Sequence, residues 1–74
     1  MTRTQRVFRI LSDRLEYDPE DITLGMRLKE DLGCDSLDRE VIASELESRY
    51  GVDIPVGAEN EWVTVEDIVK AAQT

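Results

Sequence analysis

Three segments of the chain place apolar residues at the spacing of an amphipathic α-helix, which has one apolar and one polar face. The pattern predicts helices over residues 3–16, 36–50 and 65–73. The apolar positions that share a face are Val7, Phe8, Ile10, Leu11 and Leu15 in the first segment, Ile42, Ala43, Leu46 and Tyr50 in the second, and Val65, Ile68, Val69 and Ala72 in the third. Because no strand pattern is convincing, the sequence predicts a small all-α bundle of three to four helices.

Capping residues mark where these helices begin and end. Thr2 and Gln5 have the spacing of a capping box, and Thr64 gives a similar signal before the last helix. Gly51 follows the second helix at the position where a left-handed residue is favoured. The candidate for a fourth helix is a short turn within residues 56–61.

A long loop is predicted between the first two helices. Residues 17–35 contain Pro19 and two glycines and show no helical period. The apolar side chains expected to hold this loop against the core are Ile22, Leu24, Met26, Leu28 and Leu32. Loops of this length are usually functional, so the segment is expected to contribute to function.

The chain is acidic, but its charge is unevenly distributed. It contains 17 acidic and 9 basic side chains, which gives a net charge of −8 at pH 7. Residues 1–14 carry four Arg and one Asp, a local charge of +3, so residues 15–74 carry −11. An acidic surface repels phosphate backbones and anionic lipids and attracts basic patches on proteins. We therefore expect protein partners rather than nucleic acid or membrane surfaces.

Residue counts narrow the possible functions further. A chain of 74 residues is one small domain, here 1–74, and we expect a monomer. Its single cysteine, Cys34, allows no internal disulfide, which is typical of a cytoplasmic protein. No apolar run approaches the ~18 residues of a membrane span, and the N-terminus lacks a signal-like apolar stretch. Because there is no histidine, neither a self-contained enzyme nor a metal site is expected.

The most informative segment surrounds Ser36, at the predicted start of the second helix. The backbone N–H groups and the dipole of a helix start favour a negative group there, so a phosphodiester on Ser36 would be well placed. Asp35 and Asp38 flank the serine and could hold a cation or a basic partner residue. We also expect Mg²⁺ or Ca²⁺ to raise the melting temperature, by site binding or by screening. The local pattern alone favours a simpler interpretation, in which Ser36 is only an N-cap.

The block Gly33-x-Asp35-Ser36-Leu37-Asp38 resembles the phosphopantetheine attachment motif of the acyl carrier protein family. The resemblance continues in register through residues 18–23, 30–32, 46–47, 50, 53–55 and 64–65, which is nearly the whole chain. It implies that a phosphopantetheinyl transferase moves the arm from coenzyme A onto Ser36 Oγ, with Asp35 as part of the cofactor site. The thiol of the arm then carries an acyl group as a thioester, and the protein is a carrier, not a catalyst. Fatty-acid, polyketide or specialised lipid pathways all remain open.

The resemblance also implies that the second helix docks onto basic patches of acyl-loading and acyl-processing enzymes. Glu40 and Glu47 lie within about 40° of Ser36 on a helical wheel. The expected docking residues are Leu37, Asp38, Glu40, Val41, Ser44 and Glu47. The family pattern has an apolar residue at 40, an acid at 41 and often Met at 44, so this face differs from it. Dedicated partners and drift on an ordinary solvated face both remain open.

Two other functions are compatible with the sequence. A peptidyl or aminoacyl carrier would share the fold, although Asp35 and Asp38 favour the acyl type. An unmodified acidic interaction module would need no cofactor. Cys34 is expected to be a small loop residue, and Trp62 is expected to pack on the bundle.

Overall fold

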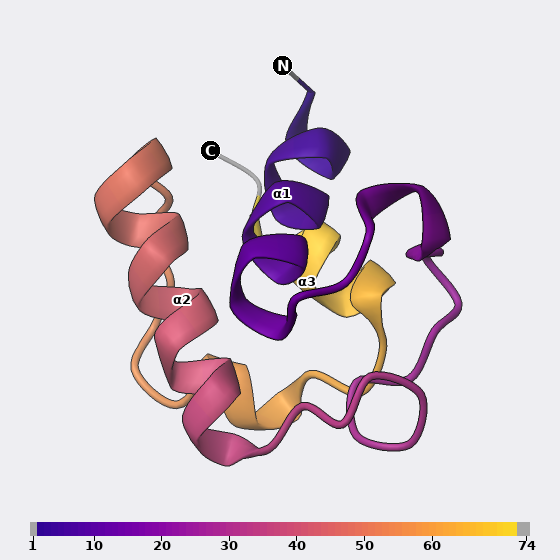
Figure 1. Cartoon of the computed structure of the whole chain (residues 1–74). Helices are drawn as coiled ribbons and strands as arrows, with labels where there is room; N and C mark the ends of the chain where they lie inside the picture. Colours follow the sequence, from indigo (N-terminus) through magenta and orange to yellow (C-terminus); the bar gives the residue numbers. More distant parts are fainter. Residues whose placement is uncertain (1, 73–74) are drawn as a thin grey trace.

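A computed structural model describes residues 2–72. In chain order the elements are helix α1 (Arg3–Leu15), the 3₁₀ turn η1 (Pro19–Asp21), helix α2 (Ser36–Tyr50), the 3₁₀ turn η2 (Ala58–Glu61) and helix α3 (Val65–Ala71). Within these residues the only β-type pairing is an isolated antiparallel bridge between Arg27 and Thr64. The predicted all-α fold is confirmed, and α1 packs against both α2 and α3 (Figure 1). No helix in the described part of the chain is long and apolar enough to cross a membrane.

The helix boundaries follow the capping signals closely. Thr2 and Gln5 form the predicted capping box, with each side chain accepting a hydrogen bond from the other residue's backbone N–H at 3.1 and 2.8 Å. Helix α1 ends one residue earlier than predicted because Glu16 adopts a left-handed conformation with φ of 55°. Helix α2 has the predicted bounds, and Gly51 ends it at φ 67°. Helix α3 ends at Ala71, and residue 73 of its predicted range lies outside the described residues.

The core is formed by the predicted helix faces together with residues of the loops. The buried side chains include Val7, Ile10 and Leu11 of α1, Ile42, Ala43 and Leu46 of α2, and Val65 and Ile68 of α3. Trp62 is also buried, as expected. The turn predicted within residues 56–61 is present as η2.

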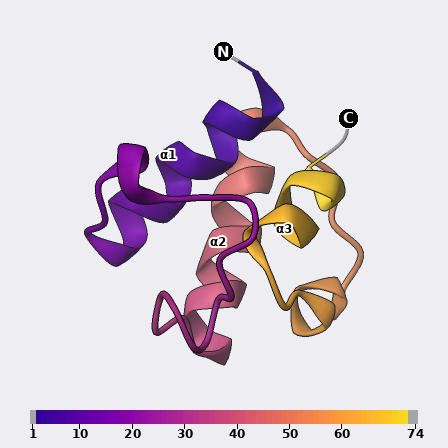
Figure 2. The same ribbon diagram turned by 90° about the vertical axis from the view of Figure 1, so that its right-hand side faces the viewer.

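The long loop is attached to the start of α3 by backbone hydrogen bonds. Leu28 N–H donates to the Val63 carbonyl at 2.8 Å, and Val65 N–H donates to the Met26 carbonyl at 3.0 Å. Figure 2 shows the loop crossing from α1 to the start of α3. Ile22, Leu28 and Leu32 are buried and Met26 is partly buried, as predicted.

The prediction that Leu24 contacts the core was wrong. Its side chain is 40% exposed, because the chain turns where Met26 N–H donates to the Thr23 carbonyl. The Leu24 carbonyl instead accepts a hydrogen bond from Glu66 N–H at 3.0 Å. This position is therefore attached through its backbone.

Candidate functional site at the start of helix α2

Asp35, not Ser36, is the N-cap of α2. Asp35 Oδ1 accepts a hydrogen bond from Asp38 N–H at 2.8 Å, and Asp38 Oδ2 accepts one from Asp35 N–H at 3.2 Å. The two aspartates thus form a reciprocal capping box. The interpretation of Ser36 as only an N-cap is wrong, because the Asp35 side chain is the one that accepts the hydrogen bond from the Asp38 N–H in the first turn of the helix.

Ser36 is the first residue of α2 and is exposed. None of the side-chain hydrogen bonds recorded within residues 2–72 involves its hydroxyl. The unsatisfied N–H groups of the first turn give this end of a helix a positive electrostatic potential. The hydroxyl is therefore accessible, and an anionic group attached to it would be stabilised by its surroundings.

The residues just before Ser36 are fixed to the core. Cys34 is 0% exposed, and its N–H donates to the Leu28 carbonyl at 2.8 Å. Gly33 supplies the left-handed turn, with φ of 67°, that brings the chain to this point. Because Cys34 is held inside, the chain passes from the core to the surface within two residues and presents Ser36 outward.

The Cys34 thiol is neutral in this setting. Burial raises its pKa to about 11, and the nearby carboxylates of Asp38 and Asp35 act in the same direction. Since the thiolate is the reactive form, the thiol is a poor nucleophile near neutral pH. Cys34 is a loop residue, as expected, but it belongs to the core and does not share the exposure of Ser36.

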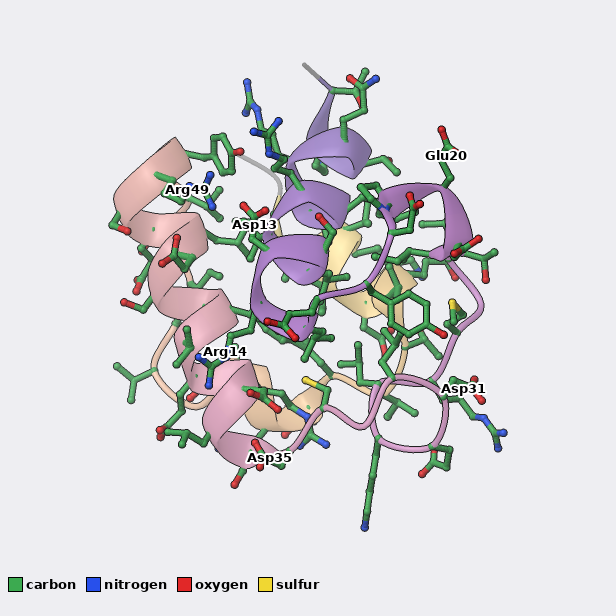
Figure 3. The ribbon with its side chains drawn as sticks, viewed as in Figure 1. Asp13, Arg14, Glu20, Asp31, Asp35 and Arg49 are labelled. Carbon is green, nitrogen blue, oxygen red and sulfur yellow. The ribbon has the colours of Figure 1, made fainter. Side chains whose placement is uncertain are left out.

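Asp38 is charged and held by helix α1. Arg14 Nε donates to Asp38 Oδ1 at 3.0 Å, and the Asp38 side chain is 18% exposed. Partial burial raises the pKa of Asp38, but hydrogen bonds from Asp35 N–H and from Arg14 outweigh it, so the net direction is downward. Figure 3 shows Arg14 beside the first turns of α2.

A depression of about 360 Å³ lies beside the serine. It is lined by Lys29, Gly33, Cys34, Asp35, Ser36 and Arg39. Two of these residues, Lys29 and Arg39, are basic, and neither was predicted to belong to the site. Arg39 could have been found from its position three residues after Ser36, which places the two side chains on neighbouring positions of the helix. Lys29 is brought there by the loop.

The predicted docking residues of α2 are divided between two sides of the helix. Leu37 is 59% exposed, and Glu40, Ser44 and Glu47 are also exposed. A depression of about 290 Å³ is lined by Glu40, Ala43, Ser44, Glu47, Ile54, Pro55, Val56 and Glu59. Val41 is partly buried and lines a different depression, of about 230 Å³, together with Ile10, Asp13, Arg14, Glu45 and Arg49. Val56 and Glu59 also line this surface and were not predicted to belong to it.

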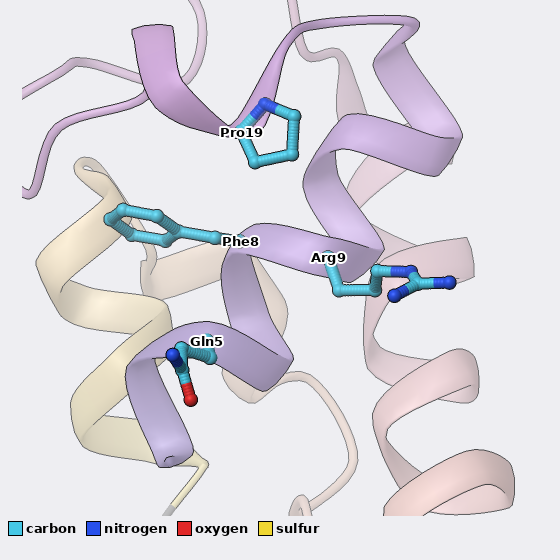
Figure 4. Close-up of a pocket in the computed structure, with 4 residues that line it drawn as sticks. All are labelled: Gln5, Phe8, Arg9 and Pro19. Carbon is cyan, nitrogen blue, oxygen red and sulfur yellow. The ribbon is translucent and has the colours of Figure 1, made fainter. Parts of the chain in front are cut away.

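Another depression, of about 490 Å³, is separate from Ser36. It is lined by Gln5, Phe8, Arg9 and Pro19. In Figure 4 the Phe8 ring of α1 lies near Pro19 of η1. Neither α1 nor η1 contributes a residue to the depression around Ser36, so the two surfaces are distinct.

Comparisons with known proteins show which family the chain belongs to. Residues 5–72 match the family model for the phosphopantetheine attachment site. The chain is 39% identical over 66 residues to the acyl carrier protein of Sinorhizobium fredii (strain NBRC 101917 / NGR234), covering 89% of this chain and 85% of that protein. It is equally similar to the acyl carrier protein AcpP of Rhizobium meliloti (strain 1021). The chain belongs to the acyl carrier protein family. The acyl carrier protein of Rickettsia massiliae (strain Mtu5) is 36% identical over 66 residues, 77% of its length.

Acyl carrier proteins are carriers rather than catalysts, and they hold 4′-phosphopantetheine covalently. The start of α2 fits such a group: it offers an exposed hydroxyl that takes no part in the capping hydrogen bonds, a positive helix end and two basic side chains. Within residues 2–72, no group of three or more potential metal ligands lies close enough together to hold an ion. Asp35 and Asp38 instead accept hydrogen bonds from each other's N–H groups.

Proposed function

We propose that Ser36 carries the phosphopantetheine arm and that the thiol of the arm carries acyl groups as thioesters. In the loading step, Ser36 Oγ forms a new bond to the phosphorus that bears pantetheine in coenzyme A. The bond from that phosphorus to the leaving 3′,5′-adenosine diphosphate breaks, and the hydroxyl proton passes to the transferase. The observation that carries this proposal is the exposed Ser36 hydroxyl, left free because Asp35 caps the helix.

The other serines are poorer candidates. Ser12 Oγ donates a hydrogen bond to the Arg9 carbonyl at 3.0 Å within α1. Ser44 and Ser48 are exposed, but both lie inside α2, away from its N-terminal N–H groups. Ser48 serves as the matched control for Ser36, because it is an exposed hydroxyl on the same helix and is not one of the proposed docking residues.

Incubation with coenzyme A and a broad-specificity phosphopantetheinyl transferase tests the assignment. We expect the intact mass to increase by one arm in the wild type and in the Ser48→Ala variant. Ser36→Ala should abolish the increase. Retention of the added mass in Ser36→Ala would refute the assignment, provided that circular dichroism shows this variant to be folded.

The outer face of α2 is proposed to dock onto basic patches of the transferase and of acyl-processing enzymes. The proposed docking residues on this face are Leu37, Glu40, Ser44 and Glu47. Val41 lies on the other side of α2, and Asp38 contributes little because Arg14 already pairs with its charge. An exposed Leu37 beside carboxylates suits a short-lived contact that is steered by charge. Val56 and Glu59 extend this face across the depression that Glu40, Ser44 and Glu47 line.

The cargo is proposed to be an acyl group rather than an aminoacyl group, and the partners to be dedicated to one fatty-acid, polyketide or specialised lipid pathway. The acyl cargo is supported by Asp35 and Asp38, which lie on either side of Ser36 and Leu37. The dedicated partners are supported by Glu40 and Val41, where the family pattern has the apolar residue first and the acid second. An assay that offers the phosphopantetheinylated protein to an acyl ligase and to an aminoacyl ligase would separate the two cargo classes. We expect only the acyl ligase to form a thioester efficiently.

A further inference from the structure

Two basic side chains beside Ser36 form no ion pair with an acidic residue of the described chain. The ion pairs recorded within residues 2–72 involve Arg9, Arg14, Arg27 and Arg49. Lys29 and Arg39 take part in none of them, although the chain has 17 acidic residues. Both line the depression that contains Ser36. Two cations are thus held beside the hydroxyl without a carboxylate partner from the described chain.

Arg39 carries an unsatisfied donor. Its Nε is buried and has no hydrogen-bond partner, the one such side-chain nitrogen or oxygen within residues 2–72. A buried donor without an acceptor is energetically costly, and native proteins usually supply one. Long side chains on a helix lean toward its N-terminus, so Arg39 leans toward the turn that begins at Ser36.

We propose that Lys29 and Arg39 hold the phosphodiester of the arm on Ser36 and direct the arm along the depression between residues 29–34 and the first turn of α2. This inference rests on the attachment proposed above. The phosphodiester is an anionic acceptor, and a guanidinium can donate to two of its oxygens at once. Because the group is tethered at Ser36 Oγ, its effective concentration beside these cations is high.

The charges around the depression favour this direction for the arm. Asp35 also lines it, but its carboxylate accepts the Asp38 N–H and is engaged in the cap. Glu40 and Glu47 lie on the other exposed side of α2 and would repel the phosphodiester. An arm held by Lys29 and Arg39 would leave the docking face uncovered, so that partners could bind α2 while the thiol remained accessible.

The first test compares the apo and fully loaded wild type by NMR, with loading verified by intact mass. We expect the Arg39 Nε–Hε resonance to move downfield on loading and to return toward its apo position as NaCl is added. If the protein loads but this resonance does not move, the inference is wrong while the proposed function stands. If the wild type does not load, the proposed function itself fails.

The second test measures the gain in melting temperature on loading. In the wild type we expect a gain of about 4 °C or more, the shift that one net hydrogen bond gives a domain of this size. The Lys29→Gln/Arg39→Gln variant, loaded to completion with excess transferase, should lose this gain. The matched control is Arg3→Gln/Lys70→Gln, which removes the same charge from the first turn of α1 and the last turn of α3, far from the start of α2 (Figure 1).

The control should keep the gain. Equal gains in the two double variants would overturn the inference. A variant that slows a partner enzyme while the wild-type resonance stays unmoved would also overturn it, since Lys29 and Arg39 would then contact an anionic partner instead of the arm. If the double variant cannot be folded or loaded, the wild-type resonance alone decides.

Discussion

Arg14 of α1 donates a hydrogen bond to Asp38 of α2, with 3.0 Å between Nε and Oδ1. Asp38 Oδ2 also accepts the Asp35 N–H, so one carboxylate links helix α1 to the cap of α2. Ser36 lies between the two aspartates of this capping box. The orientation of the proposed attachment residue therefore depends on a contact between helices as well as on local sequence.

A double-mutant cycle tests this link. We expect Arg14→Gln and Asp38→Asn to show a coupling free energy of about 1 kcal/mol in urea unfolding, because the pair is only partly exposed. The control cycle uses Arg9→Gln and Asp13→Asn, an exposed pair at 3.9 Å. Its coupling should be about 0.3 kcal/mol or less. Equal couplings in the two cycles would show that Arg14 does not support the cap.

The buried Cys34 thiol should make the free energy of unfolding fall as the pH becomes alkaline. Because the pKa of the buried thiol is raised to about 11, the folded state keeps the proton after the unfolded state has lost it. The stabilisation is present below the unfolded pKa near 9 and is lost as the pH rises toward 11, a change of about 3 kcal/mol. Cys34→Ala removes this contribution, so its free energy of unfolding should fall less steeply over the same range. Parallel pH profiles for the two proteins would contradict the buried, neutral thiol.

Charge removal on α2 tests the docking face. The Glu40→Gln/Glu47→Gln variant should lower kcat/KM for loading by a factor of about 3 to 10 at low salt, because association is steered by charge. Glu20→Gln/Glu66→Gln removes the same charge from η1 and α3 and should change kcat/KM little. The difference between the two variants should disappear in high salt. An equal loss in both variants would mean that only the net charge matters.

Divalent cations should act on this protein by screening. The carboxylates of Asp35 and Asp38 already accept hydrogen bonds from N–H groups and from Arg14. MgCl₂ should therefore raise the melting temperature no more than NaCl at equal ionic strength. A clearly larger effect of Mg²⁺, saturating with concentration, would show a specific site.

The local parts of the fold could be predicted from the sequence, because they rest on short-range signals. Helix α2 has its predicted bounds since a capping residue precedes it and Gly51 follows it. The end of α1 differed by one residue because Glu16, which is not a glycine, adopts the left-handed conformation. Two good capping residues stand side by side at positions 35 and 36, so the pattern alone could not assign the cap to Asp35.

The parts that could not be predicted depend on contacts between distant segments. Leu24 is apolar, yet its position is held by a backbone hydrogen bond to Glu66, which no side-chain pattern reveals. Lys29 lies at the Ser36 depression because backbone hydrogen bonds fix its neighbour Leu28. The Leu28 N–H donates to the Val63 carbonyl, and the Leu28 carbonyl accepts from the Cys34 N–H. Val41 was expected on one face with Ser44, but the packing of α1 places it on the other side of α2.

The most direct test of the account is fragmentation mass spectrometry of the protein purified from its own cells. We predict that the intact mass exceeds that of the sequence by one phosphopantetheine arm, with or without an acyl group, and that the fragment carrying it contains Ser36. A native protein with no such addition, or with the arm on another serine, would contradict the account.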